Sequence, residues 1–207
     1  MGAVTALARP DVAMRESWAA AMLELGDHAH GSGWVAVTGG RAVDLTAAGC
    51  AAYVAALERL GEPGPPRAPV PPGHVPTEYW WVVDGDPAEV VGFLALRREL
   101  DAWHREVGGH LGYSIRPGHR GRGHASRAVR LALARAAELG IDRLLVTCVE
   151  DNVASRRVVE RCGGVLEDVR RGTSRYRLPT GRRAAPPASP TAAAVRVRPD
   201  GAGAARA

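Results

Sequence analysis

The stretch that decides the fold of this chain reads Gly112-Tyr-Ser-Ile-Arg-Pro-Gly-His-Arg-Gly-Arg-Gly-His-Ala125. It begins like a strand, continues as a glycine-rich loop, and is followed at once by an amphipathic helical run. The start of a helix leaves about four backbone N–H groups without partners and carries a partial positive charge. The stretch therefore predicts a strand, a loop and a helix N-terminus that together bind a phosphate or pyrophosphate group.

The residues of this loop suit an anion in both size and charge. Gly121 and Gly123 let the backbone approach a bound group closely, and the small Ala125 keeps the first helical turn uncluttered. Arg120 and Arg122 add positive charge beside them. The candidate binding residues of the loop and the first turn are therefore Arg120, Gly121, Arg122, Gly123, His124, Ala125 and Ser126.

Two common phosphate-binding motifs do not fit this spacing. A dinucleotide-binding fold places G-x-G-x-x-G after an N-terminal strand, with an acidic residue about 20 positions later. A P-loop needs a lysine, and all 27 basic residues of this chain are arginines. A plain strand-to-helix turn rich in glycine is the alternative interpretation, and the flanking strand and long helix favour the binding site over it.

Hydrophobic periodicity and turn residues predict the other elements. Helices are expected over residues 14–25, 45–60, 125–139 and 153–162. Strands are expected over residues 4–7, 79–83, 90–96, 110–116, 144–149, 165–169 and 173–178. Residues 26–43 are expected to be loop. The proline-rich residues 62–73 are expected to form a stiff, extended connection, because proline interrupts helices and strands.

The loop and several other segments resemble a known family. The form R-x-x-G-x-A over Arg120–Ala125 resembles the acetyl-CoA pyrophosphate loop of the GNAT superfamily of N-acetyltransferases. Within residues 75–178 the sequence is similar to a bacterial subgroup of uncharacterised predicted acetyltransferases. The segments that carry this likeness are Val75-Pro-Thr-Glu-Tyr-Trp80, Val91-Gly-Phe-Leu-Ala-Leu-Arg97, Gly108-Gly-His-Leu-Gly-Tyr-Ser-Ile-Arg-Pro117, Asn152-Val-Ala-Ser155 and Gly163-Gly164.

This resemblance implies a fold and a co-substrate. The predicted order β-α-α-β-β-β-α-β-α-β-β is that of the GNAT acyl-CoA N-acyltransferase fold, an α/β (α+β) mixed sheet with splayed central strands and helices on both faces. Residues 1–180 would form this domain. Acetyl-CoA would bind with its pantetheine arm beside the strand that precedes the loop, like an extra strand. Its amides would then bond to main-chain groups of Tyr113, Ser114 and Ile115.

The family pattern also assigns roles around the last helix. Asn152 falls where relatives place an asparagine that contacts the pantetheine arm, and it suits the N-cap of helix 153–162 as well. Both roles are compatible, because a capping asparagine still has its amide NH₂ to offer. Many relatives carry a tyrosine seven residues later that protonates the leaving thiolate, whereas this chain has Val159. The resemblance therefore implies direct transfer with a weakly defined acid.

His110 and Glu106 are the candidate general bases. An attacking amine is mostly protonated near pH 7, so a group must take a proton before or during attack. His110 opens the strand that holds the thioester, and histidine titrates in a suitable range. The alternatives are a hydrogen-bonded structural histidine at the end of a sheet and, for Glu106, a solvated loop charge.

Aromatic and basic residues near the predicted hairpin have two interpretations each. Tyr79, Trp80 and Trp81 either wall an acceptor pocket or pack in the core, and core packing is the commoner use of such a cluster. Arg97 and Arg98 either bind an acidic acceptor or flank the end of a strand.

The charge of the chain argues against a nucleic-acid-binding protein. The whole chain has a net charge of +5, and residues 181–207, with five Arg and one Asp, account for +4 of it. Residues 1–180 therefore carry a net charge of only about +1. That Ala/Pro/Arg-rich tail has few large apolar residues, and we expect it to be disordered. Without a folded basic face or interleaved aromatic residues, we expect no specific nucleic-acid partner.

The remaining composition favours a cytoplasmic protein of one domain. No apolar run approaches the roughly 20 residues that span a bilayer, and no secretory signal is visible, so we expect no membrane partner. Cys50, Cys148 and Cys162 are too few and too scattered for a disulfide framework or a metal site. We expect Cys148 to be a small buried hydrophobe and the protein to hold no metal. A homodimer is left open.

These observations lead to one predicted function and one alternative. We predict an N-acetyltransferase (an acyltransferase for groups other than aminoacyl groups) that transfers acetyl from acetyl-CoA to a primary amine by direct attack. The acceptor would be a small molecule or a peptide, and the sequence does not name it. The alternative is an acyl-CoA-binding sensor or regulatory module without efficient turnover, which the valine at position 159 favours.

Overall fold

The computed structural model of the chain describes residues 5–62 and 73–181. Its strands are β1 (Ala6–Ala8), β2 (Thr77–Asp84), β3 (Glu89–Arg97), β4 (Leu111–Ile115), β5 (Arg143–Val149), β6 (Val165–Arg170) and β7 (Thr173–Pro179). Its helices are α1 (Arg15–Leu25), α2 (Trp34–Thr38), α3 (Ala47–Gly61), α4 (His124–Glu138) and α5 (Val153–Arg161). Short helical turns are η1 (Val12–Met14), η2 (Gly26–His28), η3 (His104–Gly108) and η4 (Pro117–His119).

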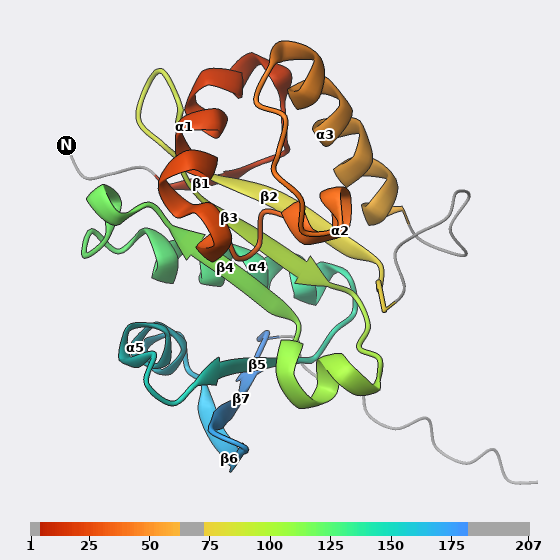
Figure 1. Ribbon diagram of the computed structural model, residues 1–207. Coiled ribbons are helices and arrows are strands. Elements are labelled where there is room, and N and C mark those ends of the chain that lie inside the picture. Colours follow the sequence, from red (N-terminus) through yellow and green to blue (C-terminus); the bar gives the residue numbers. More distant parts are fainter. Residues whose placement is uncertain (1–4, 63–72, 182–207) are drawn as a thin grey trace, which may run out of the picture.

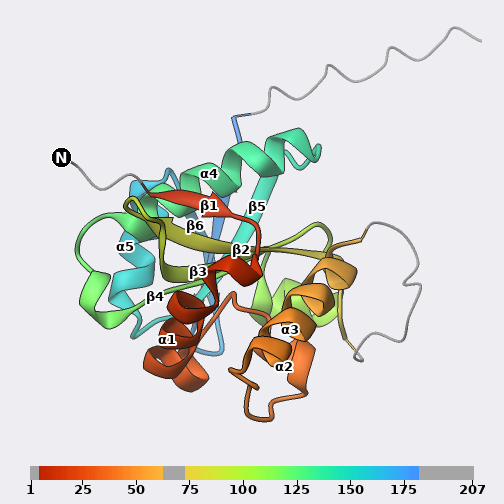
Figure 2. The same cartoon turned by 90° about the horizontal axis from the view of Figure 1, so that it is seen from above.

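The strands form two antiparallel sheets that separate between β4 and β5. The first sheet has the order β1-β2-β3-β4 and the second has the order β5-β7-β6. Helices α1, α2 and α3 cover one face of the first sheet and α4 covers the other, as the two views show (Figures 1 and 2). The helix α5 lies with the second sheet (Figure 1). The splayed α/β architecture expected of the GNAT fold is therefore confirmed.

Capping residues explain where the N-terminal helices begin and end. The Asp11 carboxylate accepts a hydrogen bond from the Ala13 N–H at 2.9 Å and starts the helical segment that continues into α1. Gly26 ends α1 with a φ of 50°, a value that glycine adopts without strain. The Thr46 hydroxyl accepts from the Gly49 N–H at 3.1 Å and caps α3.

Two apolar clusters form the core, one on each side of the first sheet. The cluster facing α1 and α3 is rich in aromatic residues, and its largest fully buried members are Trp18, Trp81 and Phe93. The other cluster joins the first sheet to α4, α5 and the second sheet, through residues such as Leu94 and Tyr176. Because this second cluster spans both sheets, it fixes how β4 and β5 lie relative to each other.

Most expected elements are present within a few residues of their predicted bounds, and α2, η2 and η3 were missed. Residues 26–43 contain α2 and η2 besides loop, and η3 has the hydrogen-bonding pattern of a π-helix. The prolines of 63–72 and the tail beyond residue 181 lie outside the described residues, so those two expectations stay predictions. Across the described ranges, none of the helices combines the length and the apolar character needed to cross a membrane.

Candidate active site

The backbone of β4 and β5 turns hydrogen-bonding groups into the gap between the sheets. On β4 the even-numbered residues pair with β3, since Arg97 N–H donates to His110 O at 2.8 Å and Arg116 N–H donates to Val91 O at 2.9 Å. Antiparallel ladders alternate, so the N–H and C=O groups of residues 111, 113 and 115 face the gap. We call this gap the slot. Its β4 edge carries peptide groups that pair with no strand, although the Ile115 carbonyl accepts a bond from Arg120 Nε.

The same alternation holds on β5. Its even-numbered residues pair with β7, as the bond from Glu150 N–H to Gly172 O at 3.0 Å shows. The peptide groups of residues 145, 147 and 149 therefore face β4 across the gap. A chain that carries amides can bond to both strands at once if it lies between them.

The gap is closed at one end by main-chain bonds. His110 N–H donates to Leu145 O at 2.7 Å, and the Leu145 N–H donates to the His110 imidazole Nδ1 at 2.8 Å. Gly109 adopts a φ of +59°, and a Cβ there would lie 2.7 Å from Leu145 O. Within the described residues no further backbone hydrogen bond joins β4 to β5, so the strands diverge beyond this point.

The wide end of the gap opens onto the glycine-rich loop and the start of α4. Gly121 has a φ of +76° and no atom within 4 Å of the position of a Cβ, so its backbone faces open space. Gly123 precedes α4 without a side-chain cap for the helix. The first-turn N–H groups of α4 thus have no side-chain acceptor from that residue, and Arg120 and Arg122 stand beside them. These features fit the predicted pyrophosphate site.

Two residues predicted to bind the cofactor have groups that point away from the slot or the loop. The main chain of Ser114 faces β3 by the register, and its hydroxyl donates to His30 O at 2.8 Å. The His124 ring is buried, with its Nδ1 3.0 Å from Thr5 Oγ1, so only the backbone of His124 can reach an anion. The register therefore argues against Ser114 as a main-chain partner and favours Tyr113 and Ile115. The Ile115 carbonyl already accepts a bond from Arg120 Nε at 3.0 Å.

The geometry of His110 favours a structural role over the predicted role of base. Its Nδ1 lone pair accepts the Leu145 N–H, so the neutral ring carries its proton on Nε2 and keeps no free lone pair. Burial is the main cause that lowers the pKa of His110 to about 4, and the positive charges of Arg177 and Arg97 act in the same direction. The ring thus joins β4 to β5 as a neutral acceptor.

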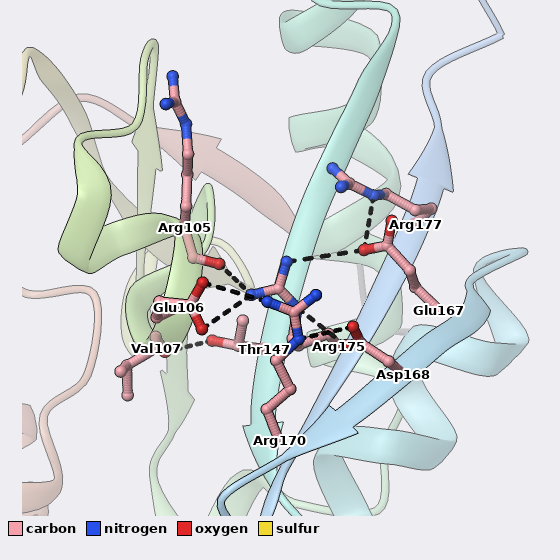
Figure 3. Close-up of polar contacts among 9 residues, drawn as sticks. All are labelled: Arg105, Glu106, Val107, Thr147, Glu167, Asp168, Arg170, Arg175 and Arg177. Carbon is pink, nitrogen blue, oxygen red and sulfur yellow. Dashed lines mark hydrogen bonds and ion pairs between the residues drawn. The ribbon is translucent and has the colours of Figure 1, made fainter.

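Glu106 takes part in a cluster of ion pairs beside the closed end (Figure 3). Its carboxylate lies 3.2 Å from Arg170 Nη1 and 3.7 Å from Arg175 Nη1. These pairs tie η3 to the hairpin of β6 and β7, and Thr147 Oγ1 adds a bond to Val107 O between β5 and η3. Glu106 is therefore held in ion pairs rather than being a solitary loop charge.

Arg175 is the buried centre of that cluster. Its guanidinium is 6% exposed, lies 2.9 Å from Asp168 Oδ1, and donates to the main-chain carbonyl of Arg105. Figure 3 shows it between the second sheet and η3, with Glu167 bridging onward to Arg177 at 3.0 Å. The closed end of the gap is thus fastened by long-range charge pairs.

Sequence reasoning missed the segment that crosses β4 on its other face. The turn before α2 lies on the middle of this strand, because a Cβ at Gly31 would collide with Gly112 O and because Ser114 bonds to His30 O. His30 is exposed, and burial of part of its ring is the main cause that lowers its pKa. The available signal was the run His28-Ala-His-Gly31, which stood inside a region expected to be plain loop.

The first turn of α5 confirms one of the two roles of Asn152. Its Oδ1 accepts from the Ser155 N–H at 3.0 Å and caps the helix, while contact with a cofactor stays a prediction. Val159 is fully buried in the core, so no ionisable side chain occupies the position of the family tyrosine. On β4, the Tyr113 hydroxyl lies 2.8 Å from Ser155 Oγ.

The other candidates from the sequence are structural. Tyr79 and Trp81 are buried in the core, and the Arg9 guanidinium stacks 3.8 Å above the Trp80 ring. Arg97 donates to Gly109 O at 3.1 Å, and Arg98 pairs with the buried Glu78. Cys148 is buried, as expected.

Metal ligands do not gather anywhere in the part of the chain that the structure describes. No group of three or more His, Cys, Asp and Glu side chains is placed there to hold an ion.

Comparisons with known proteins agree with this geometry. Residues 71–165 match the family model of the acetyltransferase (GNAT) domain. No curated protein matches the sequence of the chain. Among solved structures, the ribosomal-protein-S5-alanine acetyltransferase from Vibrio fischeri is similar with a TM-score of 0.59 and 16% identity, over 87% of this chain and 94% of that one.

Two further structures share the fold at similarly low identity. A GNAT-family acetyltransferase from Bacillus anthracis has a TM-score of 0.52 and 15% identity, over 85% of this chain and 95% of that one. The microcin C7 self-immunity acetyltransferase MccE, solved with acetyl-CoA and AMP, has a TM-score of 0.54 and 13% identity, over 84% and 92% of the two chains. The chain therefore has the GNAT fold, and residues 71–165 of it match the GNAT acetyltransferase domain, as the resemblance of its sequence predicted.

Proposed function

We propose that this protein transfers the acetyl group of acetyl-CoA to a primary amine. The observation that carries the proposal is the slot between β4 and β5, which is closed at His110 and Leu145 and opens onto the uncapped start of α4. Acetyl-CoA supplies an acetyl thioester on an arm that carries amides and ends in a pyrophosphate. The slot has peptide groups for that arm and a positive helix start for that anion.

The residues of the slot would position the thioester. The peptide groups of Tyr113 and Ile115 would hold the arm from one side, and the backbone of Gly121, Arg122 and Gly123 would hold the pyrophosphate. Backbone N–H groups that face the slot would also stabilise negative charge on the thioester oxygen as the amine attacks. A thioester held in this way would gain alignment for the attack of the amine.

The group that accepts the proton of the amine would lie on the face of β4 that the turn before α2 covers. His110 and Glu106 are both engaged in structural contacts, so neither is our preferred base. His30 lies in the turn over the middle of β4, and its lowered pKa leaves the ring neutral near pH 7. We therefore assign the proton to His30, or to water beside it. A His30→Gln variant would remove the acid limb of the pH–rate profile if the histidine is the base.

The alternative function, an acyl-CoA sensor without turnover, rests on Val159. A buried valine cannot donate a proton to the leaving thiolate, and a sensor would need no such donor. A free thiol has a pKa near ~8.5, so departure as thiolate near neutral pH needs only modest help. This chemistry favours the enzyme over the sensor.

Calorimetry of CoA binding tests the placement of the cofactor. A Gly121→Glu variant puts a carboxylate into the loop without a steric clash, since nothing lies within 4 Å of its Cβ. Charges a few Å apart at an effective dielectric near 20 repel by roughly a few kcal/mol, so affinity should fall by about 10²-fold or more. Gly39→Glu is the matched control, because Gly39 has a φ of +64° and the same open space. Equal affinity of both variants for CoA would overturn the placement.

Release of free thiol from acetyl-CoA tests the reaction itself. We expect release that depends on a primary amine when the protein is supplied with a panel of small amines and peptides with free N-termini. Tight binding of CoA with no amine-dependent release across such a panel would favour the sensor. The two experiments therefore separate binding from turnover.

A further inference from the structure

The wide end of the slot is crossed by one side chain that the proposed reaction does not yet use. Tyr113 is the middle residue of β4, and its hydroxyl lies 2.8 Å from the Ser155 Oγ in the first turn of α5. The tyrosine thus bridges from the strand that edges one side of the slot to the helix that follows the strand on the other side.

The surroundings of this tyrosine place its ring on the α4 and α5 side of the slot. The ring packs against the core cluster that joins both sheets to those helices. Its hydroxyl contacts Ser155, and Cys148 of β5 and Cys162 beside the end of α5 belong to the same cluster. The hydroxyl therefore lies between the middle of β4 and the first turn of α5, the helix that follows β5.

The protonation state of the hydroxyl suits a hydrogen-bond donor. Burial raises the pKa of Tyr113 to about 12, so the phenol keeps its proton near neutral pH. Ser155 Oγ can either donate or accept, and the Asn152 cap bonds the Ser155 main chain only. The Tyr113 hydroxyl also lies 3.4 Å from the Ser155 main-chain O, a long contact. When Ser155 Oγ donates to Tyr113, the phenol proton can turn from that carbonyl to a polar atom that enters the slot.

No other acid is available at the position where relatives carry one. Val159 is fully buried, and a Cβ at Gly164 would lie 2.5 Å from its Cγ1. Leu178 closes the same pocket, at 2.7 Å from that Cβ position. A larger side chain at position 159 does not fit there without rearranging the core, so help for the leaving group must come from elsewhere.

We propose that the Tyr113 hydroxyl, held by Ser155, donates a hydrogen bond to the CoA sulfur as it leaves. The inference rests on the proposed function, because it concerns the same transfer. When the amine nitrogen bonds to the acetyl carbon, the C–S bond breaks and its electron pair passes to sulfur. Tyr113 keeps its own proton throughout, and the proton of the amine goes to the base. The start of α5 adds a partial positive charge on the same side.

The test measures the acidity of the CoA thiol while it is bound, with no acceptor needed. Thiolate absorbance is titrated against pH for the CoA complex, and the same protein with desulfo-CoA is subtracted to remove the protein's own thiols. We expect the bound thiol to titrate below the ~8.5 of a free thiol. In Tyr113→Phe the titration should move up by about one pH unit, since the ring remains and only the donor is lost.

Tyr176→Phe is the matched control. Its buried hydroxyl also contacts α5, through Glu160 Oε1 at 2.8 Å and Arg156 Nε at 3.2 Å, but it belongs to β7. Its removal should leave the titration of the bound thiol unchanged. Amine-dependent turnover should fall by about 10- to 100-fold in Tyr113→Phe, with an unchanged KM for acetyl-CoA.

Ser155→Ala provides a second test that leaves the tyrosine in place. Without its partner the hydroxyl is less well held, and the titration should move in the same direction by a smaller amount. A bound thiol that titrates alike in the wild type, Tyr113→Phe and Ser155→Ala would overturn this inference while leaving CoA binding intact. Failure of the wild type to bind CoA would instead overturn the proposed function.

Discussion

The two ends of the gap between β4 and β5 are built on opposite principles. At the narrow end, main-chain bonds between His110 and Leu145 and the ion pairs of Arg175 join the two sheets. At the wide end, the loop around Gly121 and the uncapped start of α4 leave backbone groups facing open space. The polar groups of the narrow end are hydrogen-bonded or ion-paired within the protein, whereas backbone groups of the wide end remain available to a ligand.

This contrast shows which end contributes to stability and which to binding. A buried polar group without a partner is costly, so unpaired backbone groups persist only where solvent or a ligand can reach them. Variants at the narrow end should therefore change the free energy of unfolding first. Variants at the wide end should change affinity for CoA while leaving the fold intact.

The largest effect at the narrow end is expected from Arg175→Ala. The guanidinium is 6% exposed and faces Asp168 and Glu106, so its removal leaves carboxylates without their buried partner. Breaking a buried pair costs roughly 3–5 kcal/mol, and we expect the lower part of that range because the carboxylates reach water. Thermal unfolding should move down by about 6–12 °C.

Arg170→Ala is the control for that experiment. Arg170 pairs with the same Glu106 and Asp168, but its side chain is 51% exposed. Exposed pairs contribute little to stability, so its Tm should stay close to the wild type. A similar loss of Tm in both variants would show that burial of Arg175 is not what fastens the narrow end.

Gly109→Ala should have the next largest effect. The residue has a φ of +59°, and the new Cβ would lie 2.7 Å from Leu145 O. The segment around Gly109 and β5 must therefore move apart. The backbone strain and the clash together cost roughly 2–3 kcal/mol. Gly26→Ala is the control, because Gly26 also has a glycine-specific backbone conformation, with a φ of 50° and a ψ of −128°, but has open space around it. The difference in unfolding free energy between the two variants therefore reports mainly on the clash.

His110→Gln should lower the free energy of unfolding by a smaller amount, and this loss should depend on pH. The variant weakens the bond to the Leu145 N–H, which we expect to cost roughly 1–2 kcal/mol. The pKa of His110 is lowered to about 4 in the folded protein, below its usual value near 6.5. Its contribution is therefore fully present above about pH 6.5 and is lost as the pH falls towards 4.

Denaturant unfolding at several pH values checks this sign. The difference in stability between the wild type and His110→Gln should shrink as the pH is lowered from 6.5 to 4. The variant should also keep its acid limb in the pH–rate profile, because the ring is not the base. Loss of that limb, with normal stability, would restore His110 as the catalytic residue.

The sequence predicted the wide end because its determinants are local. The loop, the preceding strand and the start of α4 lie within one continuous stretch of 14 residues, so glycine spacing and helix periodicity were enough to place them. The family resemblance implied Tyr113, Ser114 and Ile115 as main-chain partners, and these contacts stay predictions. Setting Ser114 aside needed the pairing register of β4, which the sequence does not state.

The narrow end could not be predicted in this way because its contacts join distant segments. Glu106 and Arg170 are 64 positions apart, and Arg105 and Arg175 are 70 apart. Each of these charges looks like a solvated surface residue when it is read alone. The turn carrying His30 was missed for a related reason, since only the packing of Gly31 on Gly112 brings it to β4.

The smallest effects are expected at Asn152, where two variants distinguish a contribution to stability from a contribution to CoA binding. Asn152 caps α5 through its Oδ1, and its amide NH₂ is the group predicted to contact the cofactor. Asn152→Ser keeps a good cap and should leave the Tm unchanged, whereas Asn152→Ala loses the cap at a cost of about 1 kcal/mol.

Both variants remove the amide, so both should bind CoA more weakly, by roughly 0.5–1.5 kcal/mol for one lost hydrogen bond. Calorimetry with CoA measures that difference beside the melting curves. If Asn152→Ser binds CoA like the wild type, the asparagine serves the helix alone. The backbone groups of β4 and of the loop would then be the remaining predicted contacts with CoA at the wide end. These groups are fixed by the strand and the loop, so, unlike a side chain, they cannot rotate away from the slot.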